Sequence, residues 1–495
     1  MILGIVLGYL AISLAVGWRA GKGSSASSDG FVAGDRTLGT FVMYFITGAT
    51  IFSAFAFLGQ PAAVYTKGAS AFALLGYGCL GFVPFYWLGP RAARVGRAYG
   101  YVTQGEMVAG RFQSPALAIV MALVAIVAFV PYLALQMQGA GIVLEAITGG
   151  DIGPDVGAAL VYGVVLMYVW RSGVLGVGWT NALQGILMMV LAWILGLTVP
   201  ELMHGGVDEM FDGLVQRDPK MLVPPGYTGT PEPGVVAPWT WSQYSSRLVV
   251  MMIGFSFWPH LFMKAFTARN GDVLRRTVVL YPTFLLFLVP IFLLGFAAIG
   301  MENPPASADG ILPHLILNLD LSPVLVGLFC AGALAASMSS GDSILHAAAS
   351  ILVRDGGVRG LRLDLSPERE RGAIRALLVV VALVSYLFAV GAFGEFHIVS
   401  LLVFAYGPVG QLAPVVIATL CWRRATRHGL LAGLAVGSAT IVVCEVMNVK
   451  LPVHTGLLAL GLNAITLVLV SICTGQREPA RHERFIDTAN QPTST

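Results

Sequence analysis

The chain has 495 residues, of which 56% are hydrophobic and only 11% are charged, and its formal net charge is +3. Soluble globular proteins carry about 25% charged residues, so this composition excludes a soluble domain and indicates an integral membrane protein. The cysteines lie within or at the ends of apolar segments with no paired loop pattern, which argues against a disulfide framework or a metal cluster; they are Cys79, Cys330, Cys421, Cys444 and Cys473.

The first apolar segment begins directly after Met1, with no basic stretch before it and no clear cleavage site after it. We therefore expect a retained membrane span rather than a signal peptide. Windows of about 20 residues predict roughly thirteen spans. They cover approximately 2–18, 39–65, 70–90, 114–148, 156–170, 176–202, 240–266, 276–300, 310–352, 373–393, 397–422, 428–447 and 453–474. Three of these, 39–65, 114–148 and 310–352, are longer than one crossing needs, so we expect tilt or overhang there.

Basic residues divide between the two sides of these spans. One side holds Arg19, Lys22, Arg91, Arg94, Arg97, Arg269, Arg275, Arg276, Arg354, Arg359, Arg362, Arg369, Arg371, Arg375, Arg423, Arg424 and Arg427. The other side keeps little beyond Lys67, Arg217, Lys220 and Lys450. The positive-inside rule then predicts an N-terminus outside the cell and a cytoplasmic C-terminus.

Two spans contain helix-breaking residues near their middle. The first carries the string Thr47-Gly-Ala-Thr-Ile-Phe-Ser-Ala54, followed by Gly59 and Pro61, and the second carries Gly254-Phe-Ser-Phe-Trp-Pro-His260. Broken membrane helices expose carbonyls that bind cations and helix ends that face anions. The alternative is that these glycines and prolines only kink their helices. Two breaks about four spans apart favour inverted repeats around a central site, with spans 2–6 and 7–11 as the repeats.

A polar stripe runs along the apolar segment 331–346. Its members, Ser339, Asp342, Ser343 and His346, fall at i, i+3, i+4 and i+7 and share one helix face. Lipid offers these groups no hydrogen bonds, so the face must turn toward protein, water or an ion. Such a stripe at membrane depth is typical of a solute or ion pathway.

Four strings give the chain a recognisable family resemblance. They are Phe31-Val-Ala-Gly-Asp-Arg36, Ala49-Thr-Ile-Phe-Ser-Ala-Phe-Ala-Phe-Leu-Gly59, Ser172-Gly-Val-Leu-Gly-Val-Gly-Trp-Thr-Asn-Ala-Leu-Gln184 and Ala335-Ala-Ser-Met-Ser-Ser-Gly-Asp-Ser343. Over essentially all of its spans the chain resembles the sodium/solute symporter family, and within it the bacterial monocarboxylate and pantothenate permeases more than the sugar carriers. The resemblance implies an all-α LeuT-type inverted-repeat fold, a bacterial plasma membrane and a sodium site shared by spans 2 and 9.

Carried over residue by residue, the resemblance implies that sodium is held by the carbonyls of Ala49, Phe52 and Ala336 and the hydroxyls of Ser339 and Ser340. The chemistry agrees, since a hard cation needs several oxygens and a broken helix with a serine pair supplies them. The alternative is that both serines bond back to carbonyls one turn earlier. We expect sodium as the coupling ion and no organic cofactor.

A second cation or proton site is a further hypothesis. Many family members carry an aspartate in span 6 where this chain has Asn181, whereas Asp342 adds a carboxylate on span 9. The set to be tested is Thr180, Asn181, Asp342, Ser343 and His346. The alternative is a structural or gating hydrogen bond between Asp342 and His346.

Solute contacts are expected on spans 2, 4 and 7, at Ser53, Phe55, Ala56, Tyr132, Gln136, Phe255 and Trp258. No arginine or lysine is expected at mid-membrane in a broken helix, so a carboxylate would rely on helix ends, sodium, or Trp, Tyr and Gln donors. His260 could contribute to binding such a carboxylate; the alternative is that it caps a helix or anchors it at the interface.

Together these features predict sodium-coupled import of a small organic solute, most simply a monocarboxylate, by alternating access. A proton-coupled or uncoupled carrier, or a solute sensor acting through a separate chain, is the alternative, and no motif supports an enzyme. We expect one transmembrane transporter domain over 1–475, a short cytoplasmic tail over 476–495, a lipid bilayer around the chain, and neither nucleic acid nor an obligatory protein partner.

Overall fold

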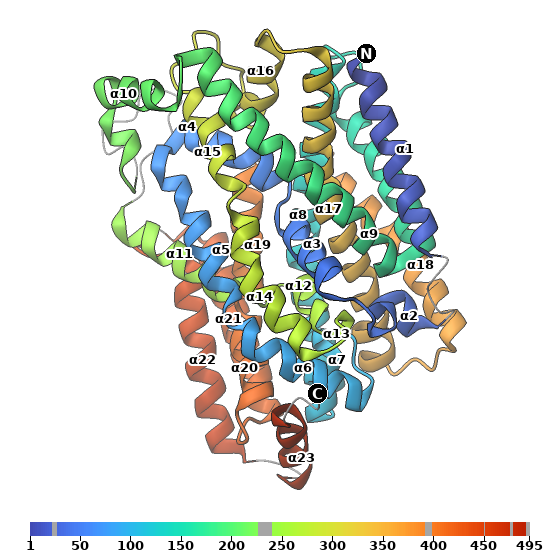
Figure 1. Ribbon diagram of the computed structural model, residues 1–495. Coiled ribbons are helices and arrows are strands. Elements are labelled where there is room, and N and C mark those ends of the chain that lie inside the picture. The colour runs from blue at the N-terminus through green and yellow to red at the C-terminus, as the bar shows by residue number, and fades with distance from the viewer. Residues whose placement is uncertain (22–26, 226–239, 392–397, 450, 476–478, 492–495) are drawn as a thin grey trace.

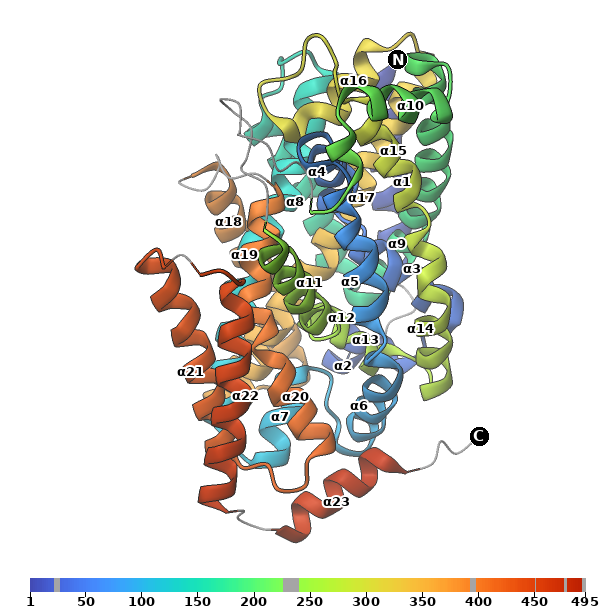
Figure 2. The ribbon, with the colours of Figure 1, turned by 90° about the vertical axis from the view of Figure 1, so that its left-hand side faces the viewer.

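The computed structural model describes all residues except 22–26, 226–239, 392–397, 450, 476–478 and 492–495. The basic residues Lys22 and Lys450, used above to predict orientation, therefore lie outside the described residues, as do parts of the predicted cytoplasmic tail 476–495. The described chain is helical, and its only strand-like pairing is one isolated bridge between Leu38 and Ala268. The two termini lie at opposite ends of a helix bundle (Figure 1, Figure 2).

The first half of the chain contains ten helices of very unequal length in its described part. They are α1 (Ile2–Ala20), α2 (Ser28–Ala33), α3 (Thr40–Ile51), α4 (Gln60–Lys67), α5 (Ala73–Phe82), α6 (Phe85–Tyr99), α7 (Gln104–Phe112), α8 (Pro115–Ile147), α9 (Pro154–His204) and α10 (Val207–Arg217).

The second half is similar. It contains α11 (Trp241–Phe255), α12 (Pro259–Phe262), α13 (Lys264–Thr267), α14 (Gly271–Leu285), α15 (Leu288–Ala297), α16 (Ile311–Asn318), α17 (Pro323–Ile351), α18 (Pro367–Val390), α19 (Ile398–Gly410), α20 (Leu412–Cys421), α21 (Arg427–Val446), α22 (Thr455–Thr474) and α23 (Pro479–Asn490).

Nine helices in the described part of the chain are long and apolar enough to cross a membrane, or ten if one bent pair counts as a single span. The all-α membrane fold is confirmed, whereas the count of thirteen spans is not. The segment 241–267 is among the predicted spans missing from this set, because it is divided into three short helices.

The prediction of one long, tilted span over 310–352 is wrong. Helix α16 ends at Asn318, and α17 begins at Pro323 after a cap in which Ser322 Oγ accepts the amide of Leu325. A serine N-cap followed by proline at the first helical position is a strong helix start, so the chain restarts here rather than running through.

Helix α9 contains the two predicted spans 156–170 and 176–202. Its helical course is interrupted at Gly173, where φ is +56° and ψ is −145°. A side chain at this position would collide with the carbonyl oxygen of Phe31, so only glycine allows both the backbone conformation and the close approach.

Both predicted helix breaks are present. Helix α3 ends at Ile51 and the chain resumes in a π-helical turn at Phe55–Gly59, with the axis bent by 55°. Helix α11 ends at Phe255 and α12 begins at Pro259, with an extended Trp258 between them. The length of segment 39–65, for which we expected tilt or overhang, is therefore explained by the predicted break.

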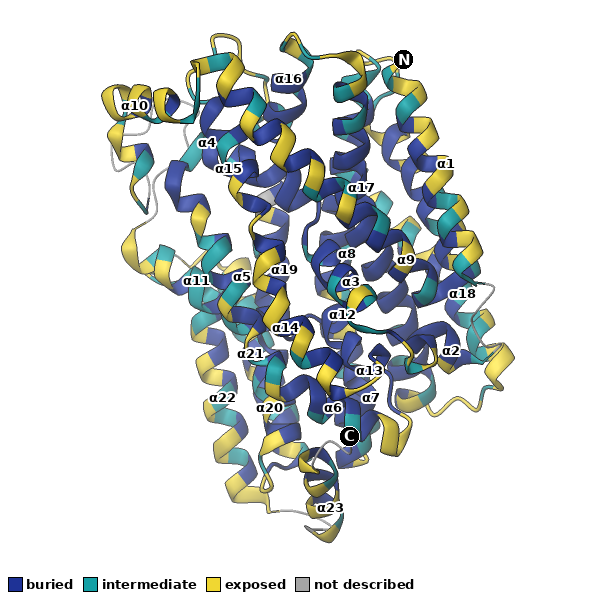
Figure 3. Ribbon diagram, in the orientation of Figure 1, coloured by how far each residue is buried: buried dark blue, intermediate teal, exposed yellow. Residues whose placement is uncertain are grey.

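Burial separates a central helix from peripheral ones (Figure 3). In α17 with its π-helical extension Leu352–Gly360, 83% of the most apolar window is buried, against 28% for α1, α18 and α21. The polar stripe predicted on segment 331–346 thus lies on the most enclosed helix and turns toward protein, as its chemistry requires.

The tail after α22 is not a loose extension where it is described. Helix α23 packs against α6 and α7, with Phe485 and Ile486 buried, Arg94 donating to the carbonyl of Ala489, and Arg481 donating to that of Gly110.

Candidate functional site

The break in α3 releases backbone groups that side chains then satisfy. The amide of Ser53 bonds to the carbonyl of Ile51 (3.0 Å) and the amide of Ala54 to Gln136 Oε1 (2.9 Å), so Ala49 and Thr50 lose the amides that a continuous helix would give their carbonyls. Ser339 Oγ donates to the carbonyl of Ala49 (2.9 Å), and Ser340 Oγ donates to that of Thr50 (2.6 Å). The hydroxyls of two serines in α17 therefore replace the amide donors that these carbonyls of α3 lose at the break.

This arrangement fits a sodium ion. Ser339 Oγ lies 2.9 Å from the Ala49 carbonyl and 3.2 Å from that of Ala336, and all three residues have no solvent exposure. Several buried, uncharged oxygens at one point are the donor set that a hard monovalent cation accepts. Phe52 lies within the break itself, with φ −83° and ψ 80°. Sequence reasoning missed Thr50, whose carbonyl takes the hydroxyl of Ser340 although it lies inside the predicted string.

The hydroxyls and amide beside this point form a second cluster. Thr50 Oγ1 lies 2.8 Å from Ser343 Oγ, and Asn181 Nδ2 donates to Thr50 Oγ1 and to the carbonyl of Ser339, both at 3.1 Å. The network connects α3, α9 and α17 and brings together predicted members of both ion sites.

Asp342 lies at the far side of this cluster, fully buried. Its Oδ2 accepts hydrogen bonds from Tyr168 (2.8 Å) and Thr180 (3.2 Å), while Oδ1 has no partner among the described residues. The predicted pairing of Asp342 with His346 is wrong, because His346 Nε2 bonds instead to the carbonyl of Phe31 at 3.1 Å. The imidazole also packs against the Phe31 ring in a tilted arrangement, with 5.6 Å between ring centroids.

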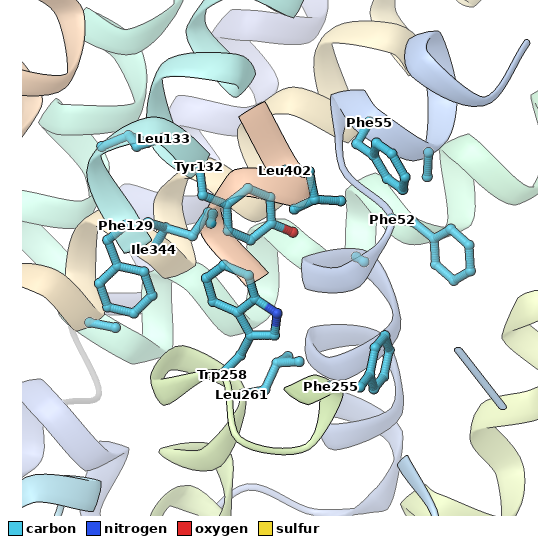
Figure 4. Packing of buried hydrophobic residues seen from close by; sticks show 14 of the residues in the cluster. Phe52, Phe55, Phe129, Tyr132, Leu133, Phe255, Trp258, Leu261, Ile344 and Leu402 are labelled. Carbon is cyan, nitrogen blue, oxygen red and sulfur yellow. The ribbon is translucent and has the colours of Figure 1, made fainter. Parts of the chain in front are cut away.

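A small cavity of about 20 Å³ lies between the two broken helices. Four of the predicted solute contacts line it, namely Phe55, Tyr132, Phe255 and Trp258. Figure 4 shows Tyr132 and Trp258 side by side, with ring centroids 4.8 Å apart, and Phe55 and Phe255 across from them.

The other three predicted contacts do not line this cavity. Gln136 turns its Oε1 to the freed amide of Ala54, and Ser53 Oγ accepts the amide of Phe55 at 3.2 Å. Ala56 is buried in the π-helical turn. Two of these side chains therefore stabilise the break.

Several lining residues were not predicted: Ile51, Leu74, Tyr77, Leu261, Leu402 and Tyr406. His260, for which both a solute contact and a capping or anchoring role were open, is only 2% exposed and lines the cavity. Its position directly after Pro259 of the second break was a usable signal. Tyr77 and Tyr406 carry no local signal, since they come from the interiors of α5 and α19.

One lysine follows the second break directly. Lys264 begins α13 and is 5% exposed. It interacts electrostatically with Asp342 and His346 on α17 and with His260 on α12. Two ionisable side chains, Lys264 and Asp342, are therefore buried in the central region.

Two larger cavities continue from the central one. An intermediate cavity of about 50 Å³ shares Phe55, Leu74 and Tyr77 with it. A further cavity of about 590 Å³, between α4, α11, α19 and the start of α22, shares Ala63 and Arg247 with the intermediate one. The three cavities therefore follow one another toward the two breaks and are divided by the side chains that they share.

An ion-pair cluster closes the bundle near α2 and α7, at the opposite end from α4 (Figure 1). Arg354, at the end of the α17 run, pairs with Asp29 (2.7 Å), Glu106 (2.9 Å) and Glu370 (3.0 Å), which belong to α2, α7 and α18. Arg359 adds a longer contact of 3.8 Å to Glu106.

Comparison with known proteins gives a consistent picture. The model of the sodium:solute symporter family matches residues 31–437. A symporter of Bacillus subtilis, YhjB, is 30% identical over 493 residues, covering 96% of this chain and 98% of the relative. A monocarboxylate transport permease protein of Rhizobium johnstonii is 24% identical, with 96% of each chain covered. The solved structure of a sodium-coupled sialic acid symporter superposes with a TM-score of 0.77 at 20% sequence identity, over 96% of this chain and 98% of that one.

Proposed function

The chain belongs to the sodium:solute symporter family and has its LeuT-type inverted-repeat fold; on that premise we propose that it imports a monocarboxylate or a similar small organic acid together with sodium. Sodium-coupled symport of a small organic solute across a membrane is the activity of the family, and the chain is a transporter rather than an enzyme.

The observation that carries the proposal is the pairing of the α17 serines with the carbonyls freed by the break in α3. Sodium would be held by the carbonyls of Ala49 and Ala336 and the hydroxyl of Ser339, with Ser340 and the carbonyl of Phe52 as further ligands. Because these oxygens belong to two helices that move relative to each other in alternating access, binding the ion favours the state in which they meet.

The aromatic cavity supports a small, partly apolar solute. No charged side chain is among its lining residues in the described chain, so an extended polyol has little to bind there. Relatives along the whole chain include a monocarboxylate permease and proline transporters, each of which takes a compact solute.

For the second cation or proton site we propose Asp342, with Thr180, Asn181 and Ser343 around it. Its support is the unpartnered Oδ1 of a fully buried carboxylate, which a cation or a proton would satisfy. His346 does not belong to this set, since its side chain is bound to Phe31.

We place the N-terminus outside the cell, as the distribution of basic residues favours. The cavity route then opens toward the outside, and the Arg354 cluster closes the cytoplasmic end. Solute and sodium would reach the breaks from outside, and opening the cluster would release them inward.

Uptake into proteoliposomes tests the proposal. The full-length chain is reconstituted, and labelled propionate, lactate, benzoate, proline and glucose are offered with an inward sodium gradient or with sodium replaced by potassium. We expect accumulation of one of the carboxylates that requires sodium. Uptake driven by a proton gradient without sodium would instead select the proton-coupled carrier, and a sodium current without accumulation of any solute would contradict symport.

A further inference from the structure

The cavity between the two breaks holds polar groups that lack partners. Tyr77 Oη and His260 Nδ1 are buried without a hydrogen-bond partner among the described residues, and the two side chains are 3% and 2% exposed. Both residues line the cavity. Proteins leave few buried polar groups unpaired, so two of them facing one cavity call for a ligand that supplies the missing bonds.

Packing, rather than hydrogen bonding, fixes the His260 ring. Its centroid lies 5.5 Å from that of Trp258, 5.6 Å from Phe129 and 5.8 Å from Tyr132, each in an edge-to-face arrangement. Tyr77 is held in the same way, 6.2 Å from Phe255 and 6.1 Å from Tyr406. Aromatic contacts, rather than hydrogen bonds, therefore hold both side chains while the cavity is closed.

The polar groups at the cavity can donate hydrogen bonds. A tyrosine hydroxyl donates one hydrogen bond, and a neutral imidazole donates one from the ring nitrogen that carries its hydrogen. Gln136, one helical turn from Tyr132, adds an unpartnered Nε2 while its Oε1 is occupied by Ala54. Among the described residues, no carboxylate lines the cavity to receive a cationic solute.

We propose that Tyr77 and His260 bind the carboxylate of the solute and make the carrier specific for an organic monoanion with a compact apolar group. The inference rests on the proposed function, because it assigns the specificity of the same central site. The apolar part of the solute lies against Trp258 and Phe255, and the carboxylate accepts hydrogen bonds from the two donors. Sodium between α3 and α17 supplies positive charge.

The cavity also indicates how the solute enters. Its volume of about 20 Å³ is smaller than any organic acid, so side chains must move apart on binding. Phe55, Leu74 and Tyr77 separate it from the intermediate cavity. A solute that enters from the intermediate cavity therefore displaces the Tyr77 side chain, and the Tyr77 hydroxyl is the first hydrogen-bond donor that it contacts.

Binding of matched carboxylates and amides tests this assignment. Purified full-length protein in lipid nanodiscs with sodium chloride is titrated with propionate, propionamide, benzoate, benzamide and choline, and the shift in its thermal unfolding midpoint gives apparent affinities. We expect a carboxylate to stabilise the protein and its amide and choline to bind at least tenfold more weakly. Tyr77→Phe and His260→Ala should each weaken carboxylate binding about 10- to 100-fold, as for loss of a hydrogen bond to a charged group, and His260→Asn should restore part of it.

Tyr281→Phe is the matched control. The Tyr281 hydroxyl is also buried and unpartnered, and its ring packs on Phe82 and Phe255, but it does not line the cavity. Carboxylate affinity should not change in this variant. Equal binding of carboxylate and amide, stronger binding of choline, no binding of any carboxylate, or unchanged affinity in Tyr77→Phe and His260→Ala would overturn the inference. The effect of sodium alone on the thermal unfolding midpoint is measured in the same experiment. If sodium alone does not stabilise the wild type, this result counts against the proposed function and not against the carboxylate assignment.

Discussion

The two faces of the break in α3 treat their polar groups in opposite ways. Toward α17, the freed carbonyls of Ala49 and Thr50 have serine hydroxyls as partners. Toward α11 and α12, Tyr77 and His260 have none among the described residues. A paired buried group stabilises the fold modestly, whereas an unpaired one costs free energy that a bound ligand can recover. Truncating a paired group should therefore lower the stability of the protein. Truncating an unpaired group should instead weaken binding of the ligand.

The sharpest test on the paired face is the double variant Ser339→Ala/Ser340→Ala. It removes two hydroxyl ligands and leaves the carbonyls of Ala49 and Thr50 without donors. We expect sodium-dependent uptake to be abolished, with sodium failing to raise the thermal midpoint. Ser350→Ala on the same helix is the control, since Ser350 Oγ only bonds back to the carbonyl of His346 (2.8 Å). Sodium dependence that survives the double variant would remove the ion from this position.

The Arg354 cluster offers a second comparison, between a buried and an exposed arginine at one end of the bundle. Arg354→Ala leaves three carboxylates without their cation, one of them on Glu106, whose side chain is 1% exposed. Breaking a buried pair by removing one partner costs about 3–5 kcal/mol, so the free energy of unfolding should fall by that amount.

Arg359→Ala is the matched case, because Arg359 is 42% exposed and lies 3.8 Å from Glu106. Its removal should cost less than about 1 kcal/mol, as for a surface pair. Equal losses in the two variants, measured by chemical unfolding in detergent, would show that the cluster is not a buried closure.

Asp342 belongs to neither class completely, because one of its oxygens is paired and the other is not. Asp342→Asn keeps an oxygen for Tyr168 and Thr180 but removes the charge. If a second cation binds here, the sodium concentration for half-maximal uptake should rise about tenfold, equivalent to about 1.4 kcal/mol. The plot of uptake against sodium concentration should also change from sigmoidal to hyperbolic. Unchanged sodium dependence with unchanged stability would make this carboxylate a purely structural group.

Sequence reasoning reaches furthest where residues lie in contiguous strings. The proposed ion site draws on residues 49–52 and 336–343, where hydroxyl and carboxyl residues lie in apolar segments. The proposed solute cavity draws Tyr77 and Tyr406 from the interiors of helices, so only tertiary packing reveals them. The hydrogen bond from the Ala54 amide to Gln136 Oε1 was not foreseen, because a break also needs an acceptor for its freed amide. The start of α17 was readable from Ser322-Pro323, a cap signal that apolar windows ignore.

The smallest expected effect comes from a comparison of two tyrosines, one whose hydroxyl has a hydrogen-bond partner and one whose hydroxyl has none. Tyr168 Oη donates to Asp342 at 2.8 Å, so Tyr168→Phe should lower the free energy of unfolding by about 1–3 kcal/mol, the cost of leaving a buried acceptor without its donor. Tyr77→Phe removes a hydroxyl that has no partner, and its stability in the absence of solute should stay within about 0.5 kcal/mol of the wild type. The same substitution should cost binding of the carboxylate, which Tyr168→Phe should leave nearly intact. Unfolding curves of both variants with and without propionate or benzoate therefore separate a group that maintains the fold from one kept for the solute, and a large loss of stability in Tyr77→Phe would contradict that separation.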